Sequence, residues 1–255
     1  MRQRSALTFA VLAAVGAPLA RSQPAPVDIV LWHTLAAQAA WCGLALLFAL
    51  LSGGSVRERL GLTRGRLSAP LLALGALGTL ALSGALQFAV DVLALAPGTS
   101  LERLDSIARL AAPESPWLVL AAFGLAPGFA EELLFRGAFQ RSLANRIGGW
   151  CVPAAALAFG ALHVDRVHSP AAFVLGCYLG ALALLGNSTW LSIACHVANN
   201  CAALQPQLLP GASPALPRPA SWAEAAVWLA CSCLSLALIG RRVRRSAPPA
   251  GATSG

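Results

Sequence analysis

Long apolar runs, separated by short polar gaps, dominate the hydrophobic pattern of the chain. An apolar run of about 20 residues is long enough to cross a bilayer as a helix, and the runs predict about eight such spans. We therefore expect an all-α fold, a polytopic membrane helix bundle. The predicted spans are 5–20, 29–51, 69–96, 117–139, 150–164, 170–185, 189–204 and 222–239.

Three parts of this pattern are open to more than one reading. The first run follows Arg2 and Arg4 and resembles a signal peptide or a first spanning helix; Pro18 disrupts the small-residue cleavage positions and favours a retained helix. The runs 150–164 and 170–185 are near the lower length limit, which predicts a tilted or partly re-entrant hairpin. Residues 97–116 are expected to form a polar loop.

The composition agrees with a membrane protein. Hydrophobic residues make up 57% of the 255 residues and charged residues only 11%, whereas soluble domains contain about 25% charged residues. The chain has no lysine, so its net charge of +8 comes from arginines in the gaps between apolar runs. This distribution indicates membrane topology and not a nucleic-acid partner.

The arginines also predict an orientation. With the N-terminus inside, twelve face the cytoplasm and five the opposite side, so we expect both termini to be cytoplasmic, in a bacterial inner (plasma) membrane. We expect a single membrane domain over 1–255, with a core at about 117–204 that contains the polar residues described below and a basic, disordered tail at 241–255. The cytoplasmic set is Arg2, Arg4, Arg57, Arg59, Arg64, Arg66, Arg141, Arg146, Arg241, Arg242, Arg244 and Arg245; the other is Arg21, Arg103, Arg109, Arg166 and Arg218.

A short set of polar residues lies at membrane depth on three separate predicted helices. Charged side chains there cost about 2.5–3.5 kcal/mol each on insertion scales, which points to function. His33 and His168, by contrast, are expected near membrane edges or in a loop, without a functional role. The residues at depth are Glu131, Glu132, Arg136, His163, His196, Asn199 and Asn200.

The two adjacent carboxylates differ in whether their own helix offers a charged partner. Glu132 and Arg136 are four residues apart, so they share a helix face and can neutralise each other. Glu131 is turned by about 100° from that face and has no partner in its own helix. We expect its partners to be His163, His196 and Asn200 on the following helices.

Three ordered motifs carry a resemblance to a known family. Glu131-Glu132-x-x-x-Arg136, Phe159-x-x-x-His163 and His196-x-x-x-Asn200 are similar to the motifs of the CPBP intramembrane proteases. That family includes the type II CAAX prenyl endopeptidases and the bacteriocin-processing and immunity proteins, also described as abortive-infection-like.

The resemblance implies a role for each motif residue. Glu131 would be the general base that activates water, and His163 and His196 would position that water or the substrate carbonyl. Asn200 would donate to the oxyanion. The remaining motif residues, Glu132, Arg136 and Phe159, would support the catalytic ones.

The sequence leaves more than one possibility for the cofactor, the partner and the function. The resemblance favours a mechanism without a cofactor, although Glu131, His163 and His196 could together hold zinc. The implied partner, besides the lipid bilayer, is a membrane-anchored or lipid-modified protein substrate: a prenylated CAAX peptide, a bacteriocin leader or a C-terminal sorting signal. A non-catalytic immunity or scaffold protein, or a transporter using the same polar residues, would be the alternative function.

Overall fold

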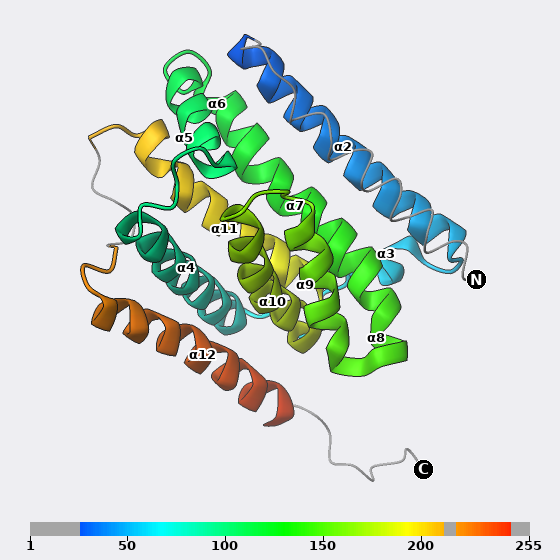
Figure 1. Cartoon of the computed structure of the whole chain (residues 1–255). Coiled ribbons are helices and arrows are strands. Elements are labelled where there is room, and N and C mark those ends of the chain that lie inside the picture. Colours follow the sequence, from blue (N-terminus) through cyan, green and yellow to red (C-terminus); the bar gives the residue numbers. More distant parts are fainter. Residues whose placement is uncertain (1–25, 212–217, 246–255) are drawn as a thin grey trace, which may run out of the picture.

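The computed structural model describes residues 26–211 and 218–245, and the chain in these ranges forms helices and connections without a strand. Figure 1 shows the helices gathered into one bundle. The longer helices are α2 (Val27–Leu51), α4 (Ala69–Val92), α5 (Ser100–Ala111), α9 (Cys151–Ala161), α10 (His168–Gly186), α11 (Thr189–Leu208) and α12 (Trp222–Arg245); the short ones are α3 (Val56–Arg59), α6 (Pro116–Val119), α7 (Ala126–Glu132) and α8 (Arg141–Ile147).

The predicted all-α membrane bundle is confirmed. Each predicted span after the first coincides with a helical stretch, whereas the span 5–20 lies outside the described residues. Within the described ranges, five helical stretches are long and apolar enough to cross a membrane. One of them, Pro116–Ala161, turns back near Gly148, where φ is 53°. The total of about eight crossings therefore stays a prediction.

Two expectations about polar segments were wrong. The segment 97–116 is not only a loop, because it contains the amphipathic helix α5, which buries Ala108 and Ala111 and carries the i,i+4 pair Asp105–Arg109. The basic segment after residue 240 is not disordered throughout, because α12 continues to Arg245. Residues 246–255 of the predicted tail lie outside the described residues.

The helix that carries the two glutamates runs through the middle of the bundle. It consists of α6, a π-helical segment (Leu120–Leu125), α7 and a second π-helical segment (Leu133–Gln140). Helices α9, α10 and α11 pack around it, while α2 and α12 lie on opposite flanks, α12 beside α4 (Figure 1). The glutamates are therefore placed where several helices converge.

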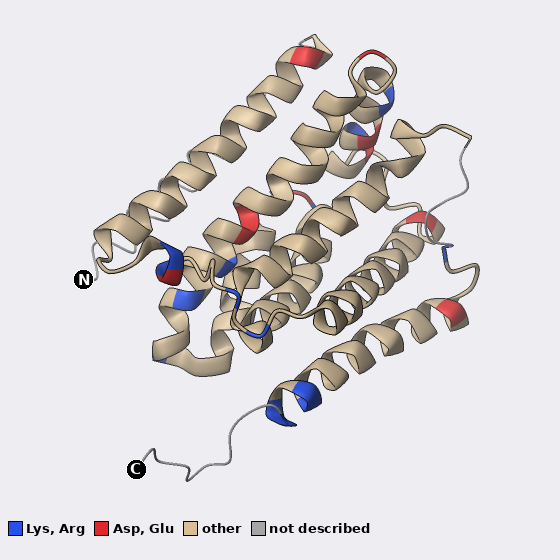
Figure 2. Cartoon of the chain, turned by 180° about the vertical axis from the view of Figure 1, so that it is seen from behind, with Lys and Arg blue, Asp and Glu red and all other residues tan. Residues whose placement is uncertain are grey.

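Charged residues are distributed unevenly between the two ends of the bundle. Figure 2 shows arginines gathered where α3, α8 and the end of α12 lie, and most acidic residues toward the other end. Glu132 and Arg136 are fully buried inside the bundle. The chain is thus an integral membrane protein with charge buried inside it.

Candidate active site

Small residues allow the neighbouring helices to approach α7 closely. A Cβ atom on Gly128 would lie 2.9 Å from the backbone nitrogen of Val197 in α11, and 2.7 Å from its side chain. Contacts under 3.0 Å would require α11 to move. Glycine at this position therefore places α11, and with it His196, directly against the helix that carries the glutamates.

Glu132 occupies the centre of a buried ionic cluster. Its Oε1 atom accepts hydrogen bonds from Nη1 of Arg136 at 2.7 Å and from Nδ1 of His196 at 3.0 Å. The side chains of Glu132 and Arg136 are both fully buried. The i,i+4 pairing predicted from the sequence is present, and His196 extends the cluster to α11.

Arg136 has partners on three helical segments. Its Nη2 donates to the carbonyl of Gly176 in α10 at 3.0 Å, and its guanidinium lies 4.7 Å from the centroid of the Phe159 ring. A Cβ on Gly176 would lie only 3.2 Å from that Nη2 atom. Arg136 thus joins α7, α9 and α10, which is a structural task suited to a planar cation with several donors.

The two candidate histidines meet around Phe159. The ring of Phe159 lies 4.9 Å from that of His163 and 6.1 Å from that of His196, each with an edge-to-face geometry. The Nδ1 atom of His163 is 3.0 Å from the carbonyl oxygen of Phe159. The tertiary fold therefore brings the second and third motifs to one place.

Hydrogen bonding also fixes which nitrogen of each imidazole carries a proton. The partners of Nδ1 are a carbonyl for His163 and a carboxylate for His196, and both can only accept. Each Nδ1 must therefore donate. In a neutral imidazole this leaves the lone pair on Nε2, which can accept a hydrogen bond from water.

Glu131 faces a different environment, against α2. It is half-buried, and its Oε1 accepts a hydrogen bond from Nε2 of Gln38 at 3.3 Å. Among the contacts of the described residues, none joins Glu131 directly to His163, His196 or Asn200, so their grouping around Glu131 stays a prediction. His196 reaches the neighbouring carboxylate instead.

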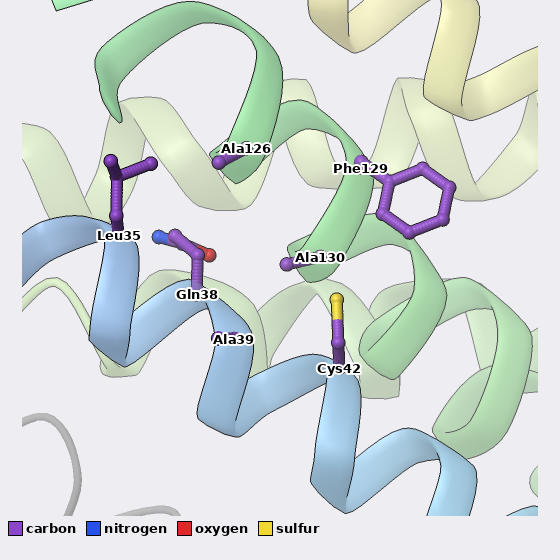
Figure 3. Close-up of a pocket in the computed structure, with 7 residues that line it drawn as sticks. All are labelled: Leu35, Gln38, Ala39, Cys42, Ala126, Phe129 and Ala130. Carbon is purple, nitrogen blue, oxygen red and sulfur yellow. The ribbon is translucent and has the colours of Figure 1, made fainter. Parts of the chain in front are cut away.

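A groove lies beside Glu131, between α2 and α7. It has a volume of about 200 Å³. Figure 3 shows Gln38 pointing from α2 toward Ala126 and Ala130 of α7. The lining is apolar apart from this one side chain, and consists of Leu35, Gln38, Ala39, Cys42, Ala126, Phe129 and Ala130.

The two asparagines of α11 follow His196 by about one turn. Asn199 is buried, and its Nδ2 lies 3.4 Å from Oδ1 of the half-buried Asn200. If Oδ1 of Asn200 accepts from Asn199, the donor group of Asn200 stays available to a ligand. Asn199, which the sequence placed at membrane depth without a role, therefore orients the amide of Asn200.

His168 has a closer relation to the site than the sequence indicated. It is the first residue of α10, and its ring lies 4.1 Å from that of His163. Its Nδ1 is 3.0 Å from the hydroxyl of Ser100 in α5. His168 therefore lies against His163, a contact that was not expected for a residue placed near a membrane edge or in a loop.

Asp165 organises the connection that holds these two histidines. Its carboxylate accepts backbone N–H bonds from Ser100 at 2.6 Å, Val167 at 2.9 Å and His168 at 2.8 Å. Burial alone would raise its pKa, but the N–H groups of His168, Ser100 and Val167 outweigh burial and hold the pKa of the Asp165 carboxyl below its usual range. The ionised carboxylate therefore caps α10 and ties it to α5.

The zinc alternative requires Glu131, His163 and His196 to converge on one point. Among the described residues, no three His, Cys, Asp or Glu side chains are close enough together to hold a metal ion. The Glu131 carboxylate accepts from Gln38, whereas the histidines are bonded through Nδ1 only. The described arrangement therefore offers no three-ligand zinc site, and no step proposed below passes through a metal.

Gln38 is the residue near the site that the sequence analysis missed. The sequence did contain a signal for Gln38: an uncharged polar side chain near the middle of an apolar span needs a hydrogen-bond partner, as a charged one does. The sequence could not say which partner, since Glu131 is 93 positions away.

Comparison with known proteins gives one match. The family model described as type II CAAX prenyl endopeptidase Rce1-like matches residues 113–202, which extend from just before α6 into α11 and include all three motifs. This is a protease family. No curated protein and no solved structure gives a significant match to the chain.

Proposed function

We propose that this chain, whose residues 113–202 belong to the type II CAAX prenyl endopeptidase Rce1-like family, is an intramembrane endopeptidase. It would hydrolyse a peptide bond near the membrane-embedded or lipidated C-terminal end of a protein substrate. The observation that carries the proposal is the unequal setting of two adjacent carboxylates. Glu132 is fully buried and bound to Arg136, whereas Glu131 is half-buried beside an open groove.

Glu131 is suited to act as general base, and Glu132 is not. A base must reach the proton that it removes, and it must lose no essential bond when it becomes protonated. Protonation of Glu132 would break the ion pair with Arg136 in the core. Glu131 would take a proton from water, the resulting hydroxide would attack the scissile carbonyl carbon, and Glu131 would return the proton to the leaving amine as the C–N bond breaks.

The histidines and Asn200 would complete this reaction. Since Nδ1 of each histidine donates within the protein, neither Nε2 can donate to a carbonyl in that tautomer. The reacting water has two O–H groups: one would point to Glu131, and the other would be accepted by the Nε2 lone pair of one histidine. The oxyanion donor must then be another group, and the carboxamide of Asn200 supplies N–H for it. This division of roles is narrower than the resemblance alone implies.

The substrate would approach from within the membrane. Prenylated CAAX peptides, bacteriocin leaders and C-terminal sorting signals all present an apolar or lipidated segment next to the bond to be cut, and an apolar groove suits each of them. The clustering of arginines at one end supports cytoplasmic termini in a bacterial inner membrane.

Replacement of Glu131 by Gln tests the proposal. The amide keeps the size of the side chain but cannot accept the proton, so cleavage should fall by about 10²- to 10⁴-fold. The assay is the accumulation of uncleaved C-terminal segments in membranes of a strain that lacks the gene and expresses either the wild type or the variant. Glu58→Gln is the matched control, because Glu58 is an exposed carboxylate on α3.

The outcomes separate the alternatives. Loss of processing in Glu131→Gln at a normal protein level, with full processing in Glu58→Gln, supports a glutamate-dependent protease. Full processing in Glu131→Gln would refute the role of Glu131, and the absence of any accumulated segment in the deletion strain would favour a non-catalytic protein. Purified enzyme should keep its activity in a metal chelator; loss that zinc restores would overturn the metal-free mechanism.

A further inference from the structure

Gln38 is a polar side chain that has no role in the reaction proposed above. It is half-buried near the middle of α2, a helix that is otherwise apolar over most of its length. Its Nε2 donates to Oε1 of Glu131. A polar side chain in such a segment is costly, so its contacts have to be explained.

The bond to Glu131 determines the orientation of the Gln38 amide. A carboxylate oxygen can only accept, so the NH₂ group must face Glu131 and the carbonyl oxygen must point elsewhere. That Oε1 atom is buried and has no hydrogen-bond partner. A buried acceptor without a partner is rare in proteins and is unfavourable unless a ligand or water satisfies it.

The packing of α2 leaves room at this position. Three residues of the helix are fully enclosed: Leu31 on one side of Gln38, and Ala45 and Ala49 on the other. Leu31 belongs to a cluster with Val119, and Ala45 to a cluster with Phe135. Between these anchors Leu35, Trp41 and Cys42 also pack against the two clusters, and a groove of about 200 Å³ remains between α2 and α7 beside Gln38.

A peptide about to be cleaved has a specific need in this groove. Its backbone must be locally extended to expose the scissile bond, which leaves N–H groups without helix partners in an apolar setting. Each unsatisfied N–H would weaken binding. Among the described residues that line the groove, Gln38 has the one amide side chain, and its Oε1 is an enclosed acceptor without a partner.

We propose that Gln38 has two tasks: its Nε2–H group positions the carboxylate of Glu131, and its Oε1 accepts a backbone N–H of the substrate in the groove between α2 and α7. The inference rests on the proposed function and adds a substrate contact from α2, which lies outside the matched segment. Gln38 is a positioning and binding residue, and the chemical step remains with Glu131.

Gln38→Met tests this inference. Methionine has a similar length and volume and no hydrogen-bonding amide, so the helix packing is kept while both bonds are lost. The control is Gln87→Met, because Gln87 also donates to a carboxylate, Asp91, at 2.7 Å, but on the exposed surface of α4. The probe is a synthetic peptide that reproduces the uncleaved C-terminal segment identified in the deletion strain.

Kinetics and binding give separate readouts. Gln38→Met should lower kcat by about tenfold, because Glu131 loses its orientation. It should raise KM by about 5- to 10-fold, because the substrate N–H loses its acceptor. In the Glu131→Gln background, where the peptide is bound but not cut, adding Gln38→Met should weaken binding by about the same 5- to 10-fold factor.

A purely structural bond between α2 and α7 would give a different result. The variant would then lose folded protein, while the remaining enzyme would keep the wild-type KM and the wild-type affinity in the Glu131→Gln background. That result, or kinetics equal to those of Gln87→Met, would overturn the inference. Wild-type activity in Glu131→Gln alone would instead overturn the proposed function, so the two failures are distinguishable.

Discussion

The two faces of α7 are built in contrasting ways. On the Glu132 face, a fully buried ion pair, a histidine and an aromatic ring join four helices, and glycines bring the backbones into contact. On the Glu131 face, α2 packs through apolar side chains and leaves a groove of about 200 Å³ beside Gln38. One face is a close-packed scaffold, and the other has space for a ligand.

This difference explains how two adjacent glutamates can serve different purposes. The scaffold fixes the imidazoles through the bonds of their Nδ1 atoms, and it does so with groups that need not change during a reaction. The open face keeps its carboxylate accessible. The pairing of a rigid scaffold with an accessible reactive group is the arrangement that precise catalysis requires.

The largest effect on the scaffold is expected from Arg136→Ala. This change leaves Glu132 as an unpaired buried charge and removes the stack on Phe159, so it should destabilise the protein by about 3–5 kcal/mol. Unfolding in detergent and the amount of protein in the membrane measure the loss. The stability of Arg136→Lys should lie between those of the wild type and Arg136→Ala, because lysine keeps the charge but loses the bond to Gly176. Wild-type stability in Arg136→Ala would contradict the scaffold role.

A smaller effect on stability is expected from a pair of substitutions that compares the two faces of α7 directly. Gly128→Val would force α11 away, because even a Cβ there approaches the backbone of Val197 too closely, and overpacking costs about 1–3 kcal/mol. Ala126→Val points into the groove and should leave the free energy of unfolding nearly unchanged. Equal destabilisation of the two variants would remove the distinction between the faces.

The smallest effect is expected at the edge of the scaffold, with Asp165→Ala. Loss of the cap on α10 should cost about 1 kcal/mol near neutral pH. Because the folded-state pKa of Asp165 is lowered, its stabilisation is complete above the unfolded pKa of about 3.9 and disappears as the pH falls through the folded value. Unfolding curves of wild type and variant should therefore converge in acid; a constant difference would show that the charge is not what stabilises the cap.

Local features of this site could be predicted from the sequence. The helical spans follow from the length of the apolar runs, and the bond between Glu132 and Arg136 follows from their i,i+4 spacing. The close approach of α11 at Gly128 follows from the spacing of small residues at 124 and 128. In each case the information lies within one turn or one helix.

Contacts between distant segments could not be predicted in this way. Spacing assigned Glu131 to the following helices, but it cannot tell how a helix is rotated against its neighbours. The π-helical segments on both sides of α7 change that rotation, and the apolar sequence gives no signal for them. As a result His196 meets Glu132, and Glu131 meets Gln38 of the preceding helix.

The closeness of Glu132 and Arg136 in the sequence has a consequence for biogenesis. As the chain is synthesised, their helix enters the membrane about 40 residues before Gly176 is made, and 60 before His196. Two isolated charges would each oppose insertion, but a pair within one helical turn can enter already neutralised. The ion pair at the core of the mature scaffold should thus also lower the cost of inserting this segment, which leaves Glu131 as the charge without a partner in its own helix.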